Sequence, residues 1–278
     1  MQWFLSCFQP IMAIEVPVLG AEYQAHLDLL AAQTDFLSQW DRLGTTNQRI
    51  YRAVLCSIEA LRRELKQAGG MTECHKAAKL KLKACLEAIP EKPFPKSMQV
   101  DVWLRYSQDP EAVATAFLQA WERLERFFLT ADVPYVMRWN SIKSSKTIWQ
   151  KIEAYEREGK DLDLWDMVRF RTSVASAPAL RRLSEQILAS FRDDVCRVRN
   201  YYVLPRGGDD DSYRAVHFEL VVGETSFELQ VHTVARDLIG LLDHDLTGTK
   251  RVAFLHDAHR EWLEELRMAA NIYDASRL

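Results

Sequence analysis

SYRAVHFELVVGETSFELQVHT, residues 212–233, alternates apolar and polar side chains through two successive runs. Because neighbouring residues of a strand point to opposite faces of a sheet, the alternation predicts two strands, and the turn residues in VGETS predict a hairpin between them. One face of this hairpin would be apolar and would cover a core. The other face would carry Tyr213, His217, Glu228, Gln230 and His232.

A solvated outer face of a sheet would explain the alternation by itself. Such a face is usually rich in Lys, Thr and Ser, whereas the strand predicted in DLWDMVRFRTSV adds Asp166, Arg169 and Arg171 to this set. Carboxylates suit Mg²⁺, arginines neutralise phosphate charge, and a tyrosine ring can stack on a base. The residue types therefore favour a site for a phosphate-rich ligand and its metal.

The helical and strand periods order the rest of the chain around this hairpin. We expect about three helices between residues 21 and 89, and one from Pro110 to Leu129. After residue 144 the expected order is helix, strand, helix, three strands and helix, and a last amphipathic helix packs back on the sheet. The fold class is then α+β, with a mixed, mostly antiparallel sheet flanked by helices.

A cluster of prolines divides the chain. Three prolines fall within PEKPFPK, residues 90–96, and such a cluster is typical of a linker. The sequence therefore predicts an all-helical domain over residues 1–97 that regulates the protein or binds a partner. Residues 98–278 would form the sheet domain.

Composition excludes several classes of protein. The net charge of −3 provides no overall basic field of the kind found in most dedicated nucleic-acid binders. The five cysteines are spread widely with no CxxC spacing, which argues against a disulfide scaffold or a zinc site. No run reaches the roughly 18 to 20 apolar residues of a membrane-spanning helix, and the first residues lack a signal-peptide pattern. We therefore expect a cytoplasmic protein with no membrane partner.

Five short segments follow one another along the chain: KSSKTIWQK, WDMVRFR, SYRAVH, FELQVHT and DHDL. Over roughly residues 138–250 they resemble the synthetase domain of the RelA/SpoT family. Its pattern is K-S-x-x-S-I-x-x-K, D-x-x-G-x-R, G-Y-x-S-x-H, E-x-Q-x-R-T and E-H. The resemblance implies a short, synthetase-only pyrophosphokinase. Such an enzyme transfers pyrophosphate from ATP to the 3′-hydroxyl of a guanosine nucleotide, GDP or GTP, and so makes an alarmone such as ppGpp for the stringent response.

The resemblance also implies roles for single residues. Asp166 and Glu228 are similar to the catalytic carboxylates that hold Mg²⁺, which takes one or two carboxylates together with phosphate oxygens and waters. Lys143 and Lys151 would hold the ATP phosphates, and Arg171 would stack on the adenine. On the same grounds the acceptor would be bound by Tyr213, His217 and Gln230, with the Tyr213 ring stacked on the acceptor base.

Four departures from the family pattern leave the acceptor open. Ser141 stands where the family has a second adenine-stacking arginine, and His232 replaces the arginine of E-x-Q-x-R-T. Ser212 replaces the glycine before Tyr213, and Asp209, Asp210 and Asp211 precede it. These carboxylates would repel a phosphate-rich acceptor unless a metal or a partner intervenes.

Two alternatives follow. The chain can direct the same chemistry to ADP, ATP or the tRNA 3′ end, as growth-inhibiting toxin relatives of the family do, with the N-terminal helices binding a protein partner or antitoxin. It can also be a catalytically weakened module that binds nucleotides and docks a partner.

Overall fold

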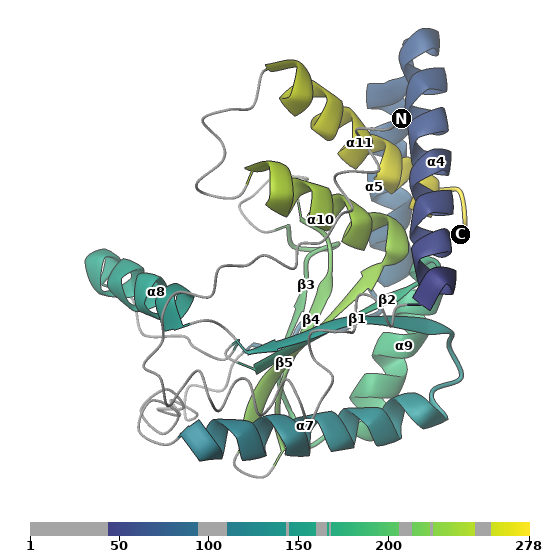
Figure 1. The fold of residues 1–278 in the computed structure, drawn as a ribbon. Coiled ribbons are helices and arrows are strands. Elements are labelled where there is room, and N and C mark those ends of the chain that lie inside the picture. The colour runs from purple at the N-terminus through teal and green to yellow at the C-terminus, as the bar shows by residue number, and fades with distance from the viewer. Residues whose placement is uncertain are drawn as a thin grey trace.

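A computed structural model of the protein describes residues 44–93, 110–142, 145–159, 166, 168–205, 213–222, 225–247 and 257–278. These residues form one five-stranded sheet with helices around it (Figure 1). The α+β class expected from the sequence is confirmed. None of the described helices combines the length and the apolar character that a bilayer crossing requires.

The sheet is mixed and mostly antiparallel, as expected. Its strands are β1 (Tyr135–Ile142), β2 (Val168–Val174), β3 (Val195–Asn200), β4 (Val216–Val222) and β5 (Thr225–Thr233). They lie side by side in the order β1-β2-β5-β4-β3. The pairing of β2 with β5 is parallel, and the other three pairings are antiparallel, including the predicted β4–β5 hairpin.

Strand β1 was not predicted. Its sequence, YVMRWNSI, places large apolar or aromatic side chains on both faces, so it shows neither a clean period of two nor a helical period. Its pairing with β2, which is interrupted by an irregularity between Met137 and Trp139, determines its structure. Context thus decides the conformation of this segment, as is common for strands.

The helices agree closely with the expected ones. They are α4 (Gly44–Ala68), α5 (Met71–Leu86), α7 (Pro110–Thr130), α8 (Ser145–Glu158), α9 (Ala177–Ser190), α10 (Val234–Thr247) and α11 (Asp257–Ala275). Local chemistry sets several of their ends. The Ser176 side chain caps α9 by accepting from the Ala179 backbone N–H, and Gly69, with φ of 69°, follows the end of α4.

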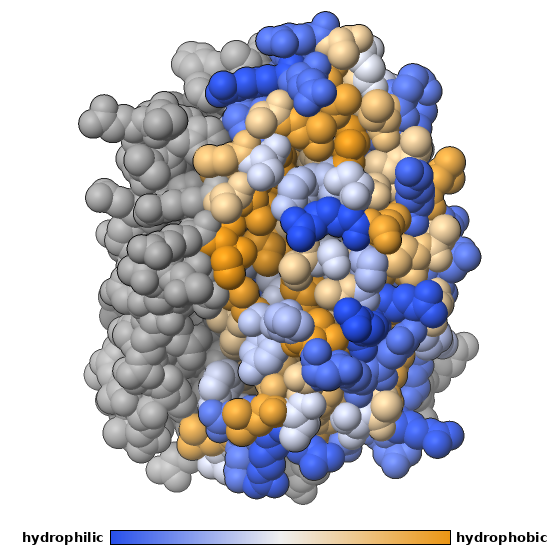
Figure 2. All heavy atoms as spheres, turned by 90° about the vertical axis from the view of Figure 1, so that its right-hand side faces the viewer, coloured by the Kyte–Doolittle hydropathy of each residue, from blue (hydrophilic) through white to orange (hydrophobic). Residues whose placement is uncertain are grey.

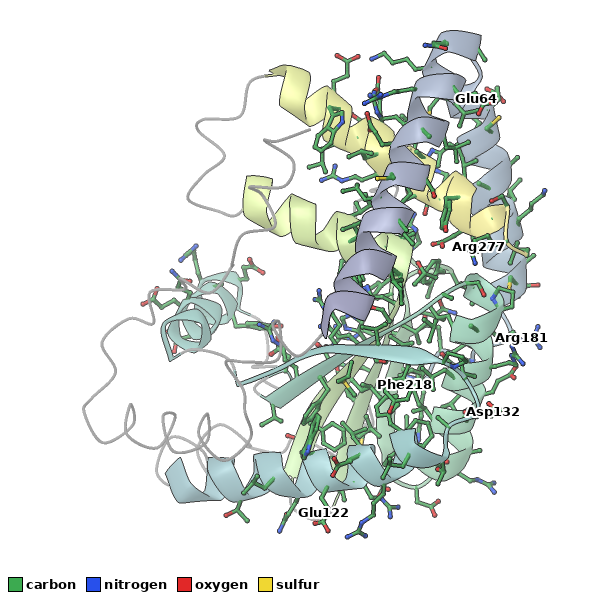
Figure 3. All side chains as sticks on the ribbon, turned by 45° about the vertical axis from the view of Figure 1, so that its right-hand side comes forward. Glu64, Glu122, Asp132, Arg181, Phe218 and Arg277 are labelled. Carbon is green, nitrogen blue, oxygen red and sulfur yellow. The ribbon has the colours of Figure 1, made fainter. Side chains whose placement is uncertain are left out.

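The main core lies on the apolar face of the sheet, under α7, α9 and part of α5. Phe218 of β4 is fully buried there, and the rings of Phe170 and Phe227 meet edge to face at 5.6 Å. Figure 3 shows Phe218 inside the molecule, whereas Arg181 on α9 and Glu122 on α7 lie at its surface. This core fixes which face of each strand is left for polar residues.

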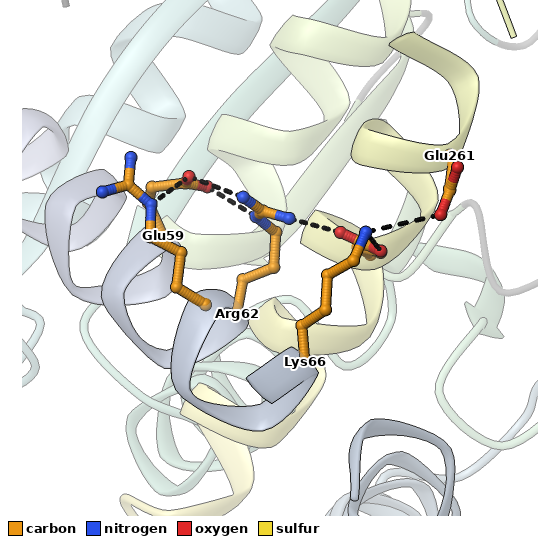
Figure 4. Close-up of polar contacts among 6 residues, drawn as sticks. Glu59, Arg62, Lys66 and Glu261 are labelled. Atoms are coloured by element: carbon orange, nitrogen blue, oxygen red, sulfur yellow. Dashed lines mark hydrogen bonds and ion pairs between the residues drawn. The ribbon is translucent and has the colours of Figure 1, made fainter. Parts of the chain in front are cut away.

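A second apolar cluster joins α4, α10 and α11, and it reaches the sheet through Val136 of β1. Ion pairs add to the contact of α4 with α11: Arg62 pairs with Glu265, and Lys66 Nζ lies 2.5 Å from Glu265 Oε1 and 3.4 Å from Glu261 Oε1 (Figure 4). The outer surface on this side of the molecule mixes hydrophilic and apolar residues (Figure 2).

Helices α4 and α5 therefore bury their apolar faces in the same two clusters as the sheet, α10 and α11. The predicted boundary at residue 97 falls among residues 94–109, outside the described part of the chain, as does the first of the three helices expected before residue 89. The division into residues 1–97 and 98–278 stays a prediction.

Asp274, near the end of α11, provides a test of this packing. Its carboxyl group is fully buried and accepts a hydrogen bond from Thr233 Oγ1 at 2.6 Å. Burial raises its pKa to about 7, although Thr233 and the charges of Arg236 and Arg277 oppose the shift. Because the folded state holds this proton more tightly than the unfolded chain, the stability that it contributes is complete below about pH 4 and is lost as the pH rises through 7.

We therefore expect Asp274→Asn to flatten the pH dependence of stability. Between pH 5 and pH 8 the free energy of unfolding of the unmodified protein should fall by about 2 to 4 kcal/mol more than that of the variant, measured by urea denaturation. Asp132→Asn, an exposed matched change, should leave the pH dependence unaltered. If the free energy of unfolding fell equally with pH in Asp274→Asn and in the unmodified protein, the expectation would be wrong.

Candidate functional site

The polar face of the sheet collects side chains from strands that are distant in the sequence. In the parallel β2–β5 pairing, Arg169 lies opposite Glu228 and Arg171 opposite Gln230. In the β4–β5 hairpin, His217 lies opposite Gln230. Directly opposed residues share a face, so the structure brings these five predicted residues onto one surface.

Hydrogen bonds join the predicted acceptor residues to the predicted catalytic carboxylate. The Tyr213 hydroxyl lies 2.5 Å from His217 Nε2, and His217 Nδ1 lies 2.9 Å from Glu228 Oε2. Gln230 Nε2 donates to Glu228 Oε1 at 2.5 Å, and Arg171 Nε donates to Gln230 Oε1 at 2.9 Å. Tyr213, His217, Glu228, Gln230 and Arg171 thus form one continuous chain, which we call the polar chain.

Glu228 is the negative centre of the polar chain. Only 4% of the residue is exposed, and such burial by itself would raise the pKa of a carboxyl group. The hydrogen bonds from His217 and Gln230, with the charges of His217 and Arg199, outweigh burial and hold the pKa of Glu228 far below its usual value. Glu228 is therefore ionised at neutral pH.

The ionised carboxylate fixes the orientation of the neighbouring imidazole. An ionised carboxylate only accepts hydrogen bonds, so His217 Nδ1 must carry the proton that it shares with Glu228. The other ring nitrogen, Nε2, lies within hydrogen-bond distance of the Tyr213 hydroxyl, so the imidazole links Glu228 to Tyr213. This arrangement holds the tyrosine in place from its hydroxyl end.

Three rings surround Tyr213. Tyr201 lies edge to face with it at 5.5 Å, and His217 does so at 5.5 Å. The third ring belongs to His232, one of the departures from the family pattern, which meets Tyr213 at 5.8 Å and 86°. The ring of Tyr213 is therefore held in one orientation, as a stacking role on a base requires.

Asp166 and Glu228 both act on Arg169. Burial and the positive charge of Arg171 lower the pKa of Arg169, whereas the negative charges of Glu228 and Asp166 raise it. Asp166 is half-buried in the turn before β2. The two carboxylates predicted to hold Mg²⁺ thus lie close enough to one arginine to influence it together.

The donor set fits a metal that is shared with a substrate. Each oxygen of Glu228 already accepts one hydrogen bond, and an ionised carboxylate has about four lone-pair sites, so acceptor capacity remains. Among the described residues, no group of three or more His, Cys, Asp or Glu side chains could form a metal cage. Mg²⁺ commonly needs only one or two carboxylates, because substrate phosphates and waters complete its shell.

Sequence reasoning missed a second charged group on this face. Glu219 lies opposite Glu228 in the hairpin and is only 1% exposed. Arg197 pairs with both of its oxygens, at 2.7 and 2.6 Å, and Arg199 pairs with it as well. Although burial opposes the shift, Glu219 raises the pKa of Arg199. The alternation that identified His217 would also have identified Glu219 two residues later.

The arginines explain how two carboxylates can face each other here. Like charges on directly opposed residues of a sheet destabilise it. Arg197 and Arg199 offset the charge of Glu219, and Arg199 also lowers the pKa of Glu228. Across the sheet from β3 to β2, the two adjacent carboxylates of Glu219 and Glu228 therefore lie between Arg197 on one side and Arg169 on the other.

Other predicted site residues are placed only in part. Lys143, Ser212 and Asp209–Asp211 lie outside the described residues. Lys151 belongs to α8 and Ser141 to β1, where Ser141 pairs with Arg169, but their side chains are likewise outside the described part. The roles implied for these residues stay predictions.

No protein-family model matches the chain, and no curated protein sequence matches it. Several solved structures are similar to it. A GTP pyrophosphokinase family protein from Streptococcus pneumoniae is 18% identical, with a TM-score of 0.46, over 65% of this chain and 92% of its own. Small alarmone synthetase 1 from Bacillus subtilis, bound to its product pppGpp, is 18% identical, with a TM-score of 0.44, over 60% of this chain and 93% of its own.

Small alarmone synthetase 2 from Bacillus subtilis is also similar, at 20% identity and a TM-score of 0.42, over 63% of this chain and 92% of its own. These structures are nearly covered by the match, whereas more than a third of this chain lies outside it. At this level of similarity, the residues of this chain have to support any function on their own.

Glu228→Gln tests the electrostatics of the polar chain. Because the folded-state pKa of Glu228 is lowered, its contribution to stability is present above its unfolded pKa near 4.5 and is lost as the pH falls below that value. We expect the variant to be less stable by about 1 to 3 kcal/mol at pH 7, with the difference shrinking below pH 4.5, measured by chemical denaturation. Glu185→Gln, on the exposed surface of α9, should change stability by less than about 0.5 kcal/mol. A Glu228→Gln protein as stable as the unmodified one at pH 7 would refute this account.

Proposed function

We propose that this protein is a Mg²⁺-dependent pyrophosphokinase that transfers pyrophosphate from ATP to the 3′-hydroxyl of a nucleotide acceptor, with GDP or GTP as the favoured acceptors. The observation that carries the proposal is the polar chain. It links residues of the acceptor, catalytic and ATP-binding motifs in one hydrogen-bonded row on one sheet face. A row of solvated side chains would need no such continuity.

In the proposed reaction the 3′-oxygen of the acceptor attacks the β-phosphorus of ATP. The bond between the β-phosphorus and the oxygen bridging it to the α-phosphorus breaks, AMP leaves with that oxygen, and the proton of the acceptor hydroxyl passes to solvent water. Transfers of this kind depend on positioning and on charge stabilisation rather than on covalent chemistry of the protein. The polar face offers groups that would position the substrates and charged groups that would stabilise the phosphates.

Glu228 is suited to orient the attacking hydroxyl. Its low pKa makes it a weak proton acceptor, whereas its ionised oxygens still accept hydrogen bonds, so it would align the hydroxyl rather than hold its proton early in the reaction. Asp166 and Glu228 would hold Mg²⁺, whose bound charge neutralises phosphate oxygens. His217 and Gln230 keep the Glu228 carboxylate in one orientation throughout.

Arginine and lysine side chains would bind the ATP. Arg171 would stack on the adenine, and Lys143 and Lys151 would neutralise the phosphates. Arg169, which lies close to both carboxylates, adds positive charge at the centre of the site. On the acceptor side, the Tyr213 ring, held by its hydroxyl and by three neighbouring rings, would stack on the base.

The proposed activity leaves the choice of acceptor to the residues around Tyr213. The carboxylates of Asp209–Asp211, next in sequence to the stacking residue Tyr213, are the sequence feature that would discriminate among acceptors. If the acceptor were ADP, ATP or the tRNA 3′ end, the protein would be a growth-inhibiting toxin. Residues 1–97 would then bind a protein partner or antitoxin. We place the protein in the cytoplasm.

A second candidate is a catalytically weakened module that binds nucleotides and docks a partner. The burial of Glu228 favours it, because both carboxylate oxygens already accept hydrogen bonds within the protein. In this case ATP would bind without AMP release.

The test is to incubate purified protein with Mg²⁺ and γ-labelled ATP against GDP, GTP, ADP, ATP and bulk tRNA, and to measure label transfer and AMP release together. We expect transfer to one acceptor, reduced about 100-fold or more by Asp166→Asn and by Glu228→Gln, because each removes charge from the reacting centre. Asp132→Asn and Glu185→Gln make the same chemical changes at exposed positions and should leave the rate unchanged.

The outcomes separate the candidates. ATP binding without transfer to any of these acceptors would favour the weakened module. Transfer that survives both Asp166→Asn and Glu228→Gln would show that the reaction does not use this face of the sheet.

A further inference from the structure

A buried carboxylate connects the polar chain to helix α4. Asp237 lies in the first turn of α10, where the helix dipole favours a negative charge, and it is fully buried. Arg171 Nη1 donates to its Oδ1 at 3.3 Å, and Ser173 Oγ donates to its Oδ2 at 2.9 Å. The hydroxyl of Tyr51, on α4, donates to the same Oδ2 at 2.8 Å across 186 residues of sequence.

Arg171 is therefore held from two directions. Its Nε donates to Gln230 on β5 and its Nη1 to Asp237 on α10, so the plane of the guanidinium is fixed by two partners on different elements. The side chain remains 14% exposed. Hydrogen bonds from Nε and Nη1 lie in the plane of the guanidinium and fix that plane, and stacking on adenine, the contact proposed for Arg171, depends on the orientation of the same plane.

We infer that Tyr51 and Asp237 are positioning residues for nucleotide binding: through Asp237, the Tyr51 hydroxyl holds the Arg171 guanidinium in the orientation that receives the ATP base. Helix α4, which contributes no side chain to the polar face itself among the described contacts, then becomes part of the nucleotide site. This inference rests on the proposed function, because it assigns Arg171 to ATP.

A purely structural role for Tyr51 makes a different prediction. A buried carboxylate needs hydrogen-bond donors, and Tyr51 would then serve only to satisfy Asp237. Removing the hydroxyl would lower stability and leave nucleotide affinity unchanged. Ser173 and Arg171 would still donate to Asp237, so the fold should survive the change and the two roles can be separated.

Tyr51→Phe separates the hydrogen bond of Tyr51 from the packing of its ring. The ring of Tyr51 belongs to the apolar cluster of α4, α10 and α11, so phenylalanine keeps that packing and removes only the hydroxyl. Asp237→Asn changes the acceptor of the same hydrogen bonds. If Tyr51 acts through Asp237, the double variant should show an effect smaller than the product of the two single effects.

Helix α4 also offers a matched control. Arg62 pairs with Glu265 of α11. Arg62 follows Tyr51 by eleven residues in α4, which corresponds to about 16 Å along the helix axis. Arg62→Ala loosens the attachment of α4 to α11 at a place that does not contact Asp237 in the described structure. It therefore reports the effect of a weakened helix contact without the loss of the Tyr51 hydrogen bond.

The experiment measures kcat, KM for ATP and KM for the acceptor in each variant. Calorimetry gives the affinity for a non-hydrolysable ATP analogue. The melting temperature of each variant is measured separately. Tyr51→Phe should raise KM for ATP and weaken analogue binding by about threefold to tenfold, the effect of one hydrogen bond. The acceptor KM and kcat should change by less than about twofold, because the acceptor residues are untouched. Arg62→Ala should lower the melting temperature and leave KM for ATP unchanged.

Two results would overturn the inference in an active protein. One is a lower melting temperature for Tyr51→Phe with unaltered KM for ATP and analogue affinity, as a structural role predicts. The other is an equal rise of KM in Arg62→Ala, which would assign the effect to general docking of α4. An unmodified protein that neither binds the analogue nor transfers pyrophosphate would instead refute the proposed function.

A spectroscopic readout tests the anchoring of Arg171 independently of activity. The side-chain Nε–H resonance of Arg171 should shift or broaden in Tyr51→Phe and stay in place in Arg62→Ala, measured by NMR on ¹⁵N-labelled protein without nucleotide. An unshifted resonance in Tyr51→Phe would overturn the positioning role even if the enzyme proved active.

Discussion

The parallel pairing of β2 with β5 is the constraint on which the site depends. It places Arg169 beside Glu228 and Arg171 beside Gln230, and the same register turns Phe170 and Leu229 into the core. A slip by one residue would send arginines into the apolar layer and phenylalanine toward solvent, so the two faces enforce the register together. Since antiparallel neighbours attach to this pair on both sides, its register also orients β1 and β4.

The polar face shows how buried charges are arranged before any ligand binds. Glu219 and Glu228 lie on adjacent strands, each with positive or donor groups around it, and their partners come from β3, β4 and β5. In a low-dielectric setting such a network strengthens its own hydrogen bonds and makes each member sensitive to the loss of another. The face is thus rigid and already polarised, which suits a reaction governed by positioning.

Much of this could be predicted from the sequence. Alternation in residues 212–233 gave the hairpin and the identity of its polar row, because period two in a half-buried sheet is a strong signal. The helical period similarly placed α7, expected from Pro110 to Leu129, nearly to the residue, and gave the order of the later helices. The order of the motifs added the family resemblance, and the nucleotide chemistry that it implies for the polar row stays a proposal.

What the sequence could not provide are relations between distant segments. Strand β1 has no clear period, and its conformation depends on β2. The contact of Tyr51 with Asp237 spans most of the chain, and neither residue belongs to a motif. Glu219 was overlooked for another reason: its alternation was visible, but the arginines on β3 that make it a site residue become neighbours only when β3 pairs with β4.

The packing of α11 against both α4 and α5 has a consequence for synthesis of the protein. Helices α4 and α5 leave the ribosome before α10 and α11, and these later helices, which pack on α4, follow it by roughly 170 to 200 residues, or on the order of 10 to 40 s at usual translation rates. During that interval the apolar side of α4 has no partner from α10 or α11. The contacts of α4 with these two helices therefore form late in synthesis, and Arg171 acquires its anchor on Asp237 only after α10 has emerged.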